Sequence, residues 1–371
     1  MFFVFFVHHF VGQIVCLLIN FNLGVHMSVT IKDVAKKAGV SPSTVSRVLS
    51  NHPRISHATS EKVKAIMLEM GYHPNIMAKS LVSKTTHSLG VILPKPAEEL
   101  FLNTFFMELI RGIVAQANRS GYDVVLSSGS SEQEEVDAVS RLVYGGRIDG
   151  AILLYSRKND PVVEFLSRNH FPAVLVGRSE QHKNIISVDT DNVQAAADAT
   201  RHLIQMGHQR IGFVSGPPEL VVSLDRMEGF KMALKEANLE FHKDWIVEGE
   251  FLQESGYRAM SFFMNLPERP TALVVVDDIV SFGILRGLHE LGYKVPEDIA
   301  IVSFNNIALS ELSTPPLSSV DIGIYHLGYS ASQALIQAIQ EKDPDKLVYQ
   351  RHIVPHRLIV RQSSIFSPPR H

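Results

Sequence analysis

The chain of 371 residues is poor in cysteine, and Cys16 is its single example. One cysteine cannot form an intrachain disulfide, a cysteine zinc cluster or a CxxC redox pair. This usage fits the reducing cytoplasm, where disulfides are rare, and we expect the protein to act there. We expect neither a metal nor a cofactor.

The sequence also lacks the motifs of three large enzyme classes: the GxSxG nucleophile elbow, the GxxxxGK[ST] P-loop and the HExxH zinc site. Asp277 and Asp278 are adjacent and invite a general-acid role. Neighbours at a strand–helix junction, however, need not face one another. We therefore predict that the protein is not an enzyme.

Residues 1–26 contain no Lys, Arg, Asp or Glu. A signal peptide needs a positively charged start and a small-residue cleavage site, and neither is evident. A membrane span would be only marginally long enough and is interrupted by His8, His9, Gln13, Asn20 and Asn22. We interpret Met27 as the true start and 1–26 as a leader of doubtful translation. The alternative is a membrane anchor or signal peptide, but we predict no membrane partner.

Charge is distributed unevenly behind a net charge of −3. Residues 27–84 carry nine Lys or Arg against three acids, a balance of +6, which leaves 26 basic against 35 acidic residues elsewhere, or −9. A basic segment attached to an acidic remainder suggests a polyanionic partner that binds at one end only.

The first predicted helix of the basic segment spans residues 31–38. Thr30 is a suitable N-cap, and Asp33 completes a capping-box pattern with its carboxylate at the positive helix end. Gly39 predicts the end of the helix, because glycine adopts the left-handed conformation at little cost.

A second helix is predicted over residues 42–49, after a short turn. Ser41 is a suitable N-cap, and proline is favoured at the first helical position, here Pro42. A third helix over about 56–70 would close a three-helix core. Two short helices joined by a glycine-containing turn form a helix-turn-helix, which places its second helix in the DNA major groove.

The outer face of this second helix has the chemistry of a DNA-reading surface. Arg47 is placed to donate two hydrogen bonds to guanine O6 and N7. Serine and threonine hydroxyls and the helix N-terminus suit phosphate oxygens. The alternative is a generic three-helix bundle with a solvated basic face. The candidate DNA contacts are Thr30, Ser41, Pro42, Ser43, Thr44, Ser46, Arg47, Asn51, Ala78 and Leu81.

The segment TIKDVAKKAGVSPSTVSRVL, followed by GYHPN at 71–75, resembles the headpiece of the LacI/GalR family of bacterial repressors. The resemblance implies that the base-reading positions fall on Pro42, Ser43 and Arg47. Pro42 has no backbone N–H to donate and Ser43 is short, so Arg47 is expected to carry most of the direct readout.

By the same resemblance, residues 75–87 hold a hinge helix that forms on operator DNA. The segment is too short to be a stable helix alone in water. Its apolar face includes Ala78 and Leu81, and Leu81 is expected to be wedged into a minor-groove step. The alternative for Leu81 is ordinary packing onto the rest of the protein.

From Ser88 onward, short apolar strands alternate with amphipathic helices, which is typical of parallel sheets covered on both faces. Two such runs predict two similar lobes. Strands are predicted at 89–93, 123–127, 150–154, 173–176, 211–215, 272–276 and 299–304. Helices are predicted at 104–120, 131–145, 192–206, 226–237, 256–265 and 279–291.

Ligands of such sheets bind in the crevice at the carboxyl ends of the strands. The residues that follow the predicted strands supply carboxylates, amides, a guanidinium and aromatic faces, a mixture that suits sugars. The candidate effector contacts are Phe105, Phe106, Asp191, Arg226, Asp278 and Asn305. Each has an ordinary alternative: Asp278 as a helix cap, the two phenylalanines as core, and Arg226 as a surface ion-pair partner.

The family resemblance extends over residues 28–364 through GHQRIGF at 207–213, VPEDIAIVSFNN at 295–306 and TPPLSSVD at 314–321. It implies a body like that of periplasmic sugar-binding proteins, with three crossovers between lobes. By position, Arg226 and Asp278 match the family's most regular effector contacts. The implied divisions are a headpiece at 27–74, a hinge at 75–87, and a body at 88–364 whose N-lobe is 88–187 and 318–345 and whose C-lobe is 188–317 and 346–364, with crossovers near 187, 317 and 345.

We therefore predict an all-α headpiece and an α/β body of two doubly wound parallel sheets, acting as a homodimeric repressor. Operator DNA and a sugar effector are the expected partners. LLYSRKNDP at 153–161 and VDTDN at 188–192 are most similar to maltose-operon repressors of Gram-positive bacteria within the family. The alternatives are a catabolite-control regulator with a protein corepressor, or an exported sugar-binding protein, against which the helix-turn-helix argues.

Overall fold

The computed structural model describes residues 29–49, 52–72, 85–94, 103–179, 181–182, 184–341, 343 and 349–365. The chain divides into two compact units, Met1–Lys84 and Thr85–His371, called here the head and the body. The leader 1–26, Asn51, and Ala78 and Leu81 of the expected hinge helix lie outside the described residues. Across the described part of the chain, no helix is long and apolar enough to cross a membrane.

The described part of the head contains three helices, α2 (Ile31–Ala38), α3 (Pro42–Leu49) and α4 (His57–Glu69). The capping box predicted for α2 is present: the Asp33 carboxylate accepts from the Thr30 N–H at 2.9 Å and from the Thr30 hydroxyl at 2.6 Å. Gly39 ends α2 with φ at 69°, a left-handed conformation. Local sequence signals thus define both ends of the helix.

Small apolar side chains form the core of the head. Val34 and Ala38 of α2, Val45 and Val48 of α3, and Val63 of α4 are buried together. Their helical spacing leaves each helix with one polar face in solvent. The core therefore fixes which side of α3 is exposed.

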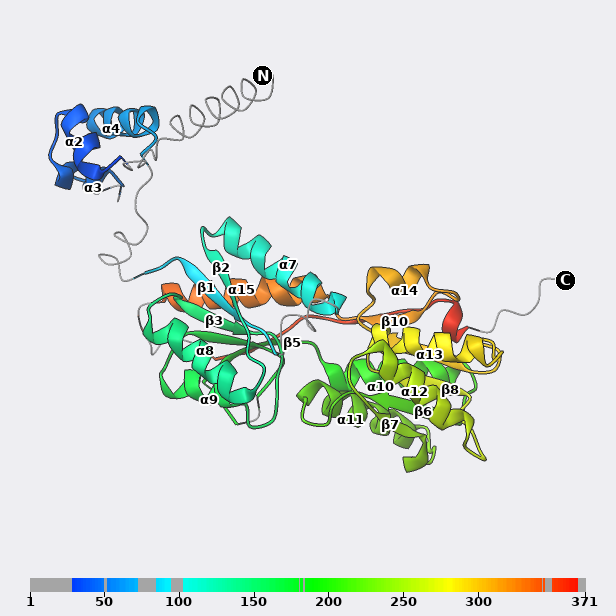
Figure 1. The fold of residues 1–371 in the computed structure, drawn as a ribbon. Coiled ribbons are helices and arrows are strands. Elements are labelled where there is room, and N and C mark those ends of the chain that lie inside the picture. The colour runs from blue at the N-terminus through cyan, green and yellow to red at the C-terminus, as the bar shows by residue number, and fades with distance from the viewer. Residues whose placement is uncertain are drawn as a thin grey trace, which may run out of the picture. The chain divides into compact units, whose positions relative to one another are not determined.

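The body contains two six-stranded sheets (Figure 1). The strands of the first are β1 (Ser88–Ile92), β2 (Asp123–Ser127), β3 (Gly150–Leu153), β4 (Ala173–Val176), β5 (Ile186–Asp189) and β11 (Arg351–Ile353). They run in the order β11-β5-β4-β3-β1-β2, and every pairing is parallel. The order reverses at β1, and ligands of such sheets bind at the carboxyl ends of the strands beside such a reversal.

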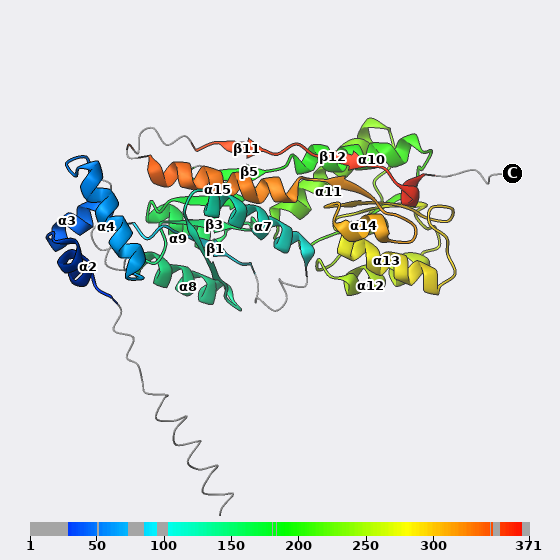
Figure 2. The same ribbon diagram turned by 90° about the horizontal axis from the view of Figure 1, so that it is seen from above.

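Helices cover both faces of this first sheet. Those on one face are α7 (Thr104–Arg119) and α15 (Ile324–Gln340), which lie side by side (Figure 2), and those on the other are α8 (Glu132–Tyr144) and α9 (Pro161–Arg168). Within β3 and just beyond it, Ile152 and Leu154 join one hydrophobic core, whereas Ala151 and Leu153 join the other. This alternation is the period of two expected of a strand buried on both faces.

The second sheet repeats the design. Its strands are β6 (Ile211–Ser215), β7 (Ile246–Glu248), β8 (Ala272–Val275), β9 (Ala300–Phe304), β10 (Ser318–Asp321) and β12 (Arg357–Ile359), in the order β12-β10-β9-β8-β6-β7. Only the β10–β12 pairing is antiparallel among these. The helices are α10 (Asn192–Gln205), α11 (Val221–Glu236), α12 (Gln253–Met264), α13 (Asp278–Glu290) and α14 (Ala308–Leu312), with short 3-10 turns at Lys243–Trp245 and Gln362–Ser364. The strand order reverses at β6, which lies between β7 and β8 in the sheet.

The chain crosses between the two sheets after β5, after β10 and after β11. Crossovers were expected near residues 187, 317 and 345, so the first two lie a few residues further along and the third lies about ten residues further along. The expectation that residues 318–321 belong to the N-lobe is wrong: Ser318 and Val320 pair with β9 of the second sheet. Likewise, residues 351–353 pair with β5 of the first sheet rather than joining the C-lobe.

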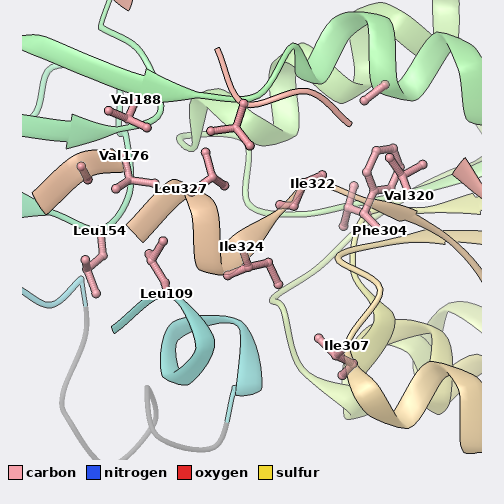
Figure 3. Close-up of a cluster of buried hydrophobic side chains, with 14 of the residues drawn as sticks. Leu109, Leu154, Val176, Val188, Phe304, Ile307, Val320, Ile322, Ile324 and Leu327 are labelled. Atoms are coloured by element: carbon pink, nitrogen blue, oxygen red, sulfur yellow. The ribbon is translucent and has the colours of Figure 1, made fainter. Parts of the chain in front are cut away.

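A continuous apolar core joins the two lobes along the second crossover. Figure 3 shows Leu109 and Leu327 on the first-lobe side, Phe304 on the second-lobe side, and Ile322 and Ile324 between them. All five are buried. The predicted fold class, a helical head followed by an α/β body of two parallel sheets, is confirmed.

Candidate DNA-binding and effector sites

The amino end of α3 gathers hydroxyl groups. Ser41 Oγ accepts from the Thr44 N–H at 3.1 Å and lies 2.7 Å from Ser43 Oγ and 2.9 Å from Thr44 Oγ1. Ser41, Pro42 and Ser43 are exposed. A helix N-terminus with free hydroxyl capacity suits a phosphate group, since the N–H groups of the first turn point outward.

The outward face of α3 continues with Ser46 and Arg47, both exposed, whereas Val45 and Val48 are buried on the opposite face. The helix is therefore oriented by its core so that Arg47 projects from the head. A guanidinium in that position has the reach and the donor geometry for a guanine edge. Thr30, also exposed, lies at the amino end of α2.

In the body, Arg226 is at the centre of a buried polar cluster. Its Nε donates to Asn192 Oδ1 at 3.0 Å, and its Nη1 donates to the Val276 carbonyl at the end of β8. The guanidinium carbon lies 4.1 Å from the Phe304 ring centroid. Burial lowers the pKa of Arg226 to about 10, although nearby carboxylates, Asp277 first, oppose that shift. The alternative of a surface ion-pair partner is wrong, because Arg226 is 3% exposed.

Asp277, not Asp278, caps α13. Asp277 Oδ1 accepts from the Ile279 N–H at 2.7 Å, and burial together with the charge of Asp278 raises the Asp277 pKa to about 7. The alternative that Asp278 caps the helix is therefore wrong by one residue, because the cap is the preceding residue. The reason is that α13 begins at Asp278, one residue before the predicted start at 279.

Asp278 connects three elements from a fully buried position in the first turn of α13. Its Oδ2 accepts from the Ile307 N–H at 2.9 Å and from Ser310 Oγ at 2.7 Å, and its Oδ1 accepts from Ser319 Oγ at 2.8 Å. Burial raises its pKa, and these hydrogen bonds oppose the rise. The carboxylate thus ties α13 to α14 and β10.

Asn305 follows β9 with φ at 100°, a left-handed conformation that is rare outside glycine. Its Nδ2 donates to Asp277 Oδ2 at 2.7 Å, while its Oδ1 is buried and has no donor among the described residues. An unsatisfied buried acceptor is costly. This oxygen is therefore well suited to a hydroxyl donor from a ligand.

The remaining candidates lie apart from this network. Asp191 is exposed and caps α10 by accepting from the Gln194 N–H at 3.0 Å, and it is its neighbour Asn192 that contacts Arg226. Phe105 and Phe106 are half-buried in the first turn of α7, with ring centroids 5.1 Å apart, and pack against the core. Asn103 caps that helix through the Phe105 N–H at 2.9 Å.

Sequence reasoning missed two residues beside the end of β6. A Cβ placed on Gly216 would lie 2.5 Å from the Phe251 ring and 2.7 Å from Ser223 Oγ, so both side chains approach the backbone closely there. Ser223 Oγ is buried and has no partner within the described part of the chain. Phe251 follows β7, a three-residue strand whose sequence gave too weak a signal to predict. Glycine at 216 and an aromatic after a strand are the signals that could have found this site.

Comparison with known proteins assigns both units. The profile of bacterial regulatory proteins of the lacI family matches residues 30–75, and that of periplasmic binding protein-like domains matches residues 200–364. The chain is 36% identical over 339 residues to the HTH-type transcriptional regulator MalR of Streptococcus pneumoniae, which covers 90% of this chain and 99% of that protein. It is 35% identical over 339 residues to catabolite control protein A of Priestia megaterium, covering 91% of this chain and 100% of that one.

Among solved structures, the lac repressor dimer bound to operator and the anti-inducer ONPF is similar, with a TM-score of 0.81 at 27% identity. The match covers 91% of this chain and 99% of that chain. The likeness therefore runs through the head and the body together.

Proposed function

The chain belongs to the LacI family of bacterial transcriptional regulators, and we propose that it is a homodimeric repressor of carbohydrate-utilisation genes whose effector is maltose or a maltodextrin. It would act in the cytoplasm, on the operator DNA of those genes. The maltose assignment is supported by the likeness to a regulator named MalR and by the polar chemistry of the buried cluster around Arg226.

The observation that carries the effector proposal is the unsatisfied Oδ1 of Asn305 beside Asp277 and Arg226. These groups sit where the second sheet presents the carboxyl ends of β8 and β9, next to the reversal of strand order, which is where such sheets bind ligands. A vicinal diol offers hydroxyls that both donate and accept. The ring of Phe251 would supply the apolar face that a sugar ring needs. Asp278 remains a proposed contact within this cluster, and Asp191, Phe105 and Phe106 remain proposed contacts outside it.

The DNA contacts are proposed on the exposed face of α3. Arg47 would read a guanine, and the hydroxyls of Ser41, Ser43 and Thr44 would bind phosphates. One headpiece reaches few bases, so two related by a two-fold axis would bind a palindromic operator. In the linker, Leu81 is proposed as the minor-groove wedge.

Sugar can release operator only if it binds more tightly to the conformation that fits DNA poorly. Calorimetric titration with maltose and maltotriose, beside glucose, ribose and cellobiose, tests the effector. We expect the two maltodextrins to bind and to weaken operator binding in a mobility-shift assay. Binding of none of the five sugars would refute the effector assignment, while binding of another sugar of the panel would replace it.

The likeness to catabolite control protein A supports a second candidate, a regulator that responds to a protein corepressor. In that case, sugars would leave operator affinity unchanged, and a cellular protein would be needed for tight operator binding. The same mobility-shift assay, run with and without cell extract, separates the two candidates.

A further inference from the structure

Two segments from different lobes pair through their backbones. The Lys158 N–H, in the loop after β3, donates to the Glu219 carbonyl at 3.0 Å. The Val221 N–H, at the start of α11, donates to the Ser156 carbonyl, also at 3.0 Å. Between these bonds, Arg157 and Leu220 form an antiparallel bridge. The first sheet is therefore held to the second by a short piece of β-structure at the strand ends.

An ion pair joins the lobes beside this bridge. Arg178, just after β4, donates from Nε to Asp225 Oδ2 at 2.9 Å and from Nη2 to Oδ1 at 2.5 Å. This two-point geometry is the strong form of an arginine–carboxylate pair. Asp225 lies on α11 and its side chain is 3% exposed, so solvent weakens the pair less than it would on an open surface.

Side-chain contacts connect the bridge to the ion pair. Ser156 Oγ donates to the Arg178 carbonyl. Gly177 has φ at 109°, and a Cβ there would come within 2.9 Å of the Ser156 Cβ, so only glycine allows the two strand ends to approach. The bridge and the ion pair should therefore form and break together.

The bridge loop is also anchored within its own lobe. Arg157 is paired with Glu135 and, at 3.2 Å, with Asp160, and its guanidinium carbon lies 4.9 Å from the Tyr155 ring centroid. Both carboxylates are buried. This anchoring keeps the loop in the conformation that reaches the second lobe.

We propose that residues 156–158 and Arg178 of the first lobe, with residues 219–221 and Asp225 of the second, form an interlobe latch that holds the body closed without an effector. Asp225 immediately precedes Arg226 on α11, so the latch also fixes the helix that carries the central effector group. Arg178 is thus a positioning residue that sets effector affinity. This inference rests on the proposed function only for the identity of the effector.

The latch acts on affinity through the population of the closed state. The apparent dissociation constant of a ligand rises in inverse proportion to the fraction of molecules in the binding-competent state. If loss of Arg178 leaves about a tenth of the molecules closed, maltose binds about tenfold more weakly, with no ligand contact removed.

Hydrogen exchange on the intact, sugar-free protein tests the latch directly. The Lys158 and Val221 amides report its closure, and the β8 amides report global folding. Arg178→Gln should speed exchange at the two latch amides by about tenfold, in proportion to the open population, and leave β8 unchanged. The matched control is Arg168→Gln, which removes an exposed arginine paired with Glu164 on the same helix of one lobe. Unchanged latch amides in a folded Arg178→Gln protein would overturn the proposal.

Two further variants and a titration complete the test. Arg178→Lys should restore part of the protection, and Asp225→Asn, which keeps the side-chain volume, should repeat the opening if Arg178→Gln does not fold. In maltose titrations, the affinity of each variant should be lower the faster its latch amides exchange. An open latch with unchanged maltose affinity would overturn the role in affinity. An open latch in a protein that binds none of the tested sugars would refute the proposed effector and leave the latch standing.

Discussion

The head and the body place their polar groups in opposite environments. On α3 of the head, the candidate contacts are exposed except for the half-buried Thr44, and the side chains behind them are small and apolar. In the body, Arg226, Asp277 and Asp278 are buried, and each forms hydrogen bonds with neighbouring protein groups. A surface that binds a polyanion gains from exposed, mobile charge, whereas a site that recognises a small neutral ligand gains from fixed groups in a dry pocket.

Substitutions in the two regions should therefore have different effects on binding and stability. Loss of an exposed head residue should change DNA binding and leave stability intact. Loss of a buried body residue should change stability as well as ligand binding, because the polar or charged groups that it contacts would stay buried without a partner. The single tryptophan, Trp245, lies buried in the body and reports on that unit alone.

The largest effect is expected at Arg226. Arg226→Gln leaves Asp277 and its neighbours without their buried cation and should lower the free energy of unfolding of the body by about 3–5 kcal/mol. Urea denaturation followed by Trp245 fluorescence measures this loss. Arg286→Gln, which breaks an exposed pair with Glu290 on α13, is the control and should leave the midpoint unchanged. Equal losses of unfolding free energy in both variants would contradict the expected difference between a buried and an exposed arginine.

The next effect is expected at Arg47. Arg47→Ala should weaken specific operator binding by about 1–3 kcal/mol, since a bidentate guanine contact contributes that much discrimination. The Trp245 denaturation curve should not move. Lys64→Ala on α4, an exposed residue paired with Glu61, serves as the control for loss of positive charge alone. Destabilisation of the body by Arg47→Ala would contradict the expectation that a head substitution leaves the stability of the body unchanged.

Leu81 allows a finer distinction within DNA binding. Leu81→Ala should weaken specific operator binding more than nonspecific binding, because only the kinked operator complex uses the wedge. Filter binding to operator and to random DNA at one salt concentration measures both affinities. Equal losses on the two DNAs would contradict the wedge.

The pH dependence of stability should have opposite signs in the two units. The Asp277 pKa is raised from 3.8 to about 7, so its stabilising contribution is complete below pH 3.8 and is lost as the pH rises through 7. The stability of the body, measured by denaturation followed through Trp245, should therefore fall as the pH rises between these values, and Asp277→Asn should flatten the trend.

Asp33 of the head behaves conversely. The hydrogen bonds from Thr30 lower the pKa of Asp33, so its contribution is present above the ordinary carboxyl range and is lost on acidification. Asp33→Asn should reduce hydrogen-exchange protection of the α2 amides at neutral pH, and the difference from the natural protein should vanish in acid. The same sign of pH dependence in both units would contradict this assignment.

Sequence reasoning predicted the head well, because its determinants are local. Thr30, Asp33 and Gly39 define α2 within a few residues of themselves, and the predicted bounds of α2 and α3 are those observed. Only short-range caps and one helical repeat were needed.

The body was predicted in class but not in detail. The strands β5, β7, β10, β11 and β12 were missed, because they are only three or four residues long and carry polar or charged side chains among the apolar ones. Helix α11 starts at Val221, five residues before the predicted 226, since the preceding glycine and prolines suggested a longer loop. The site inherits these errors: Asn192 and Phe251 are placed by long-range packing that no local pattern encodes, whereas Asp277 is a local helix cap that was assigned one residue too late.

The buried cluster in the body and the exposed face of α3 should be coupled through operator and sugar binding. Calorimetric titration of the intact protein with maltose, with and without saturating operator DNA, tests it most directly. Operator should weaken maltose binding by the same factor by which maltose weakens operator binding. Maltose affinity that is unchanged by saturating operator would contradict it.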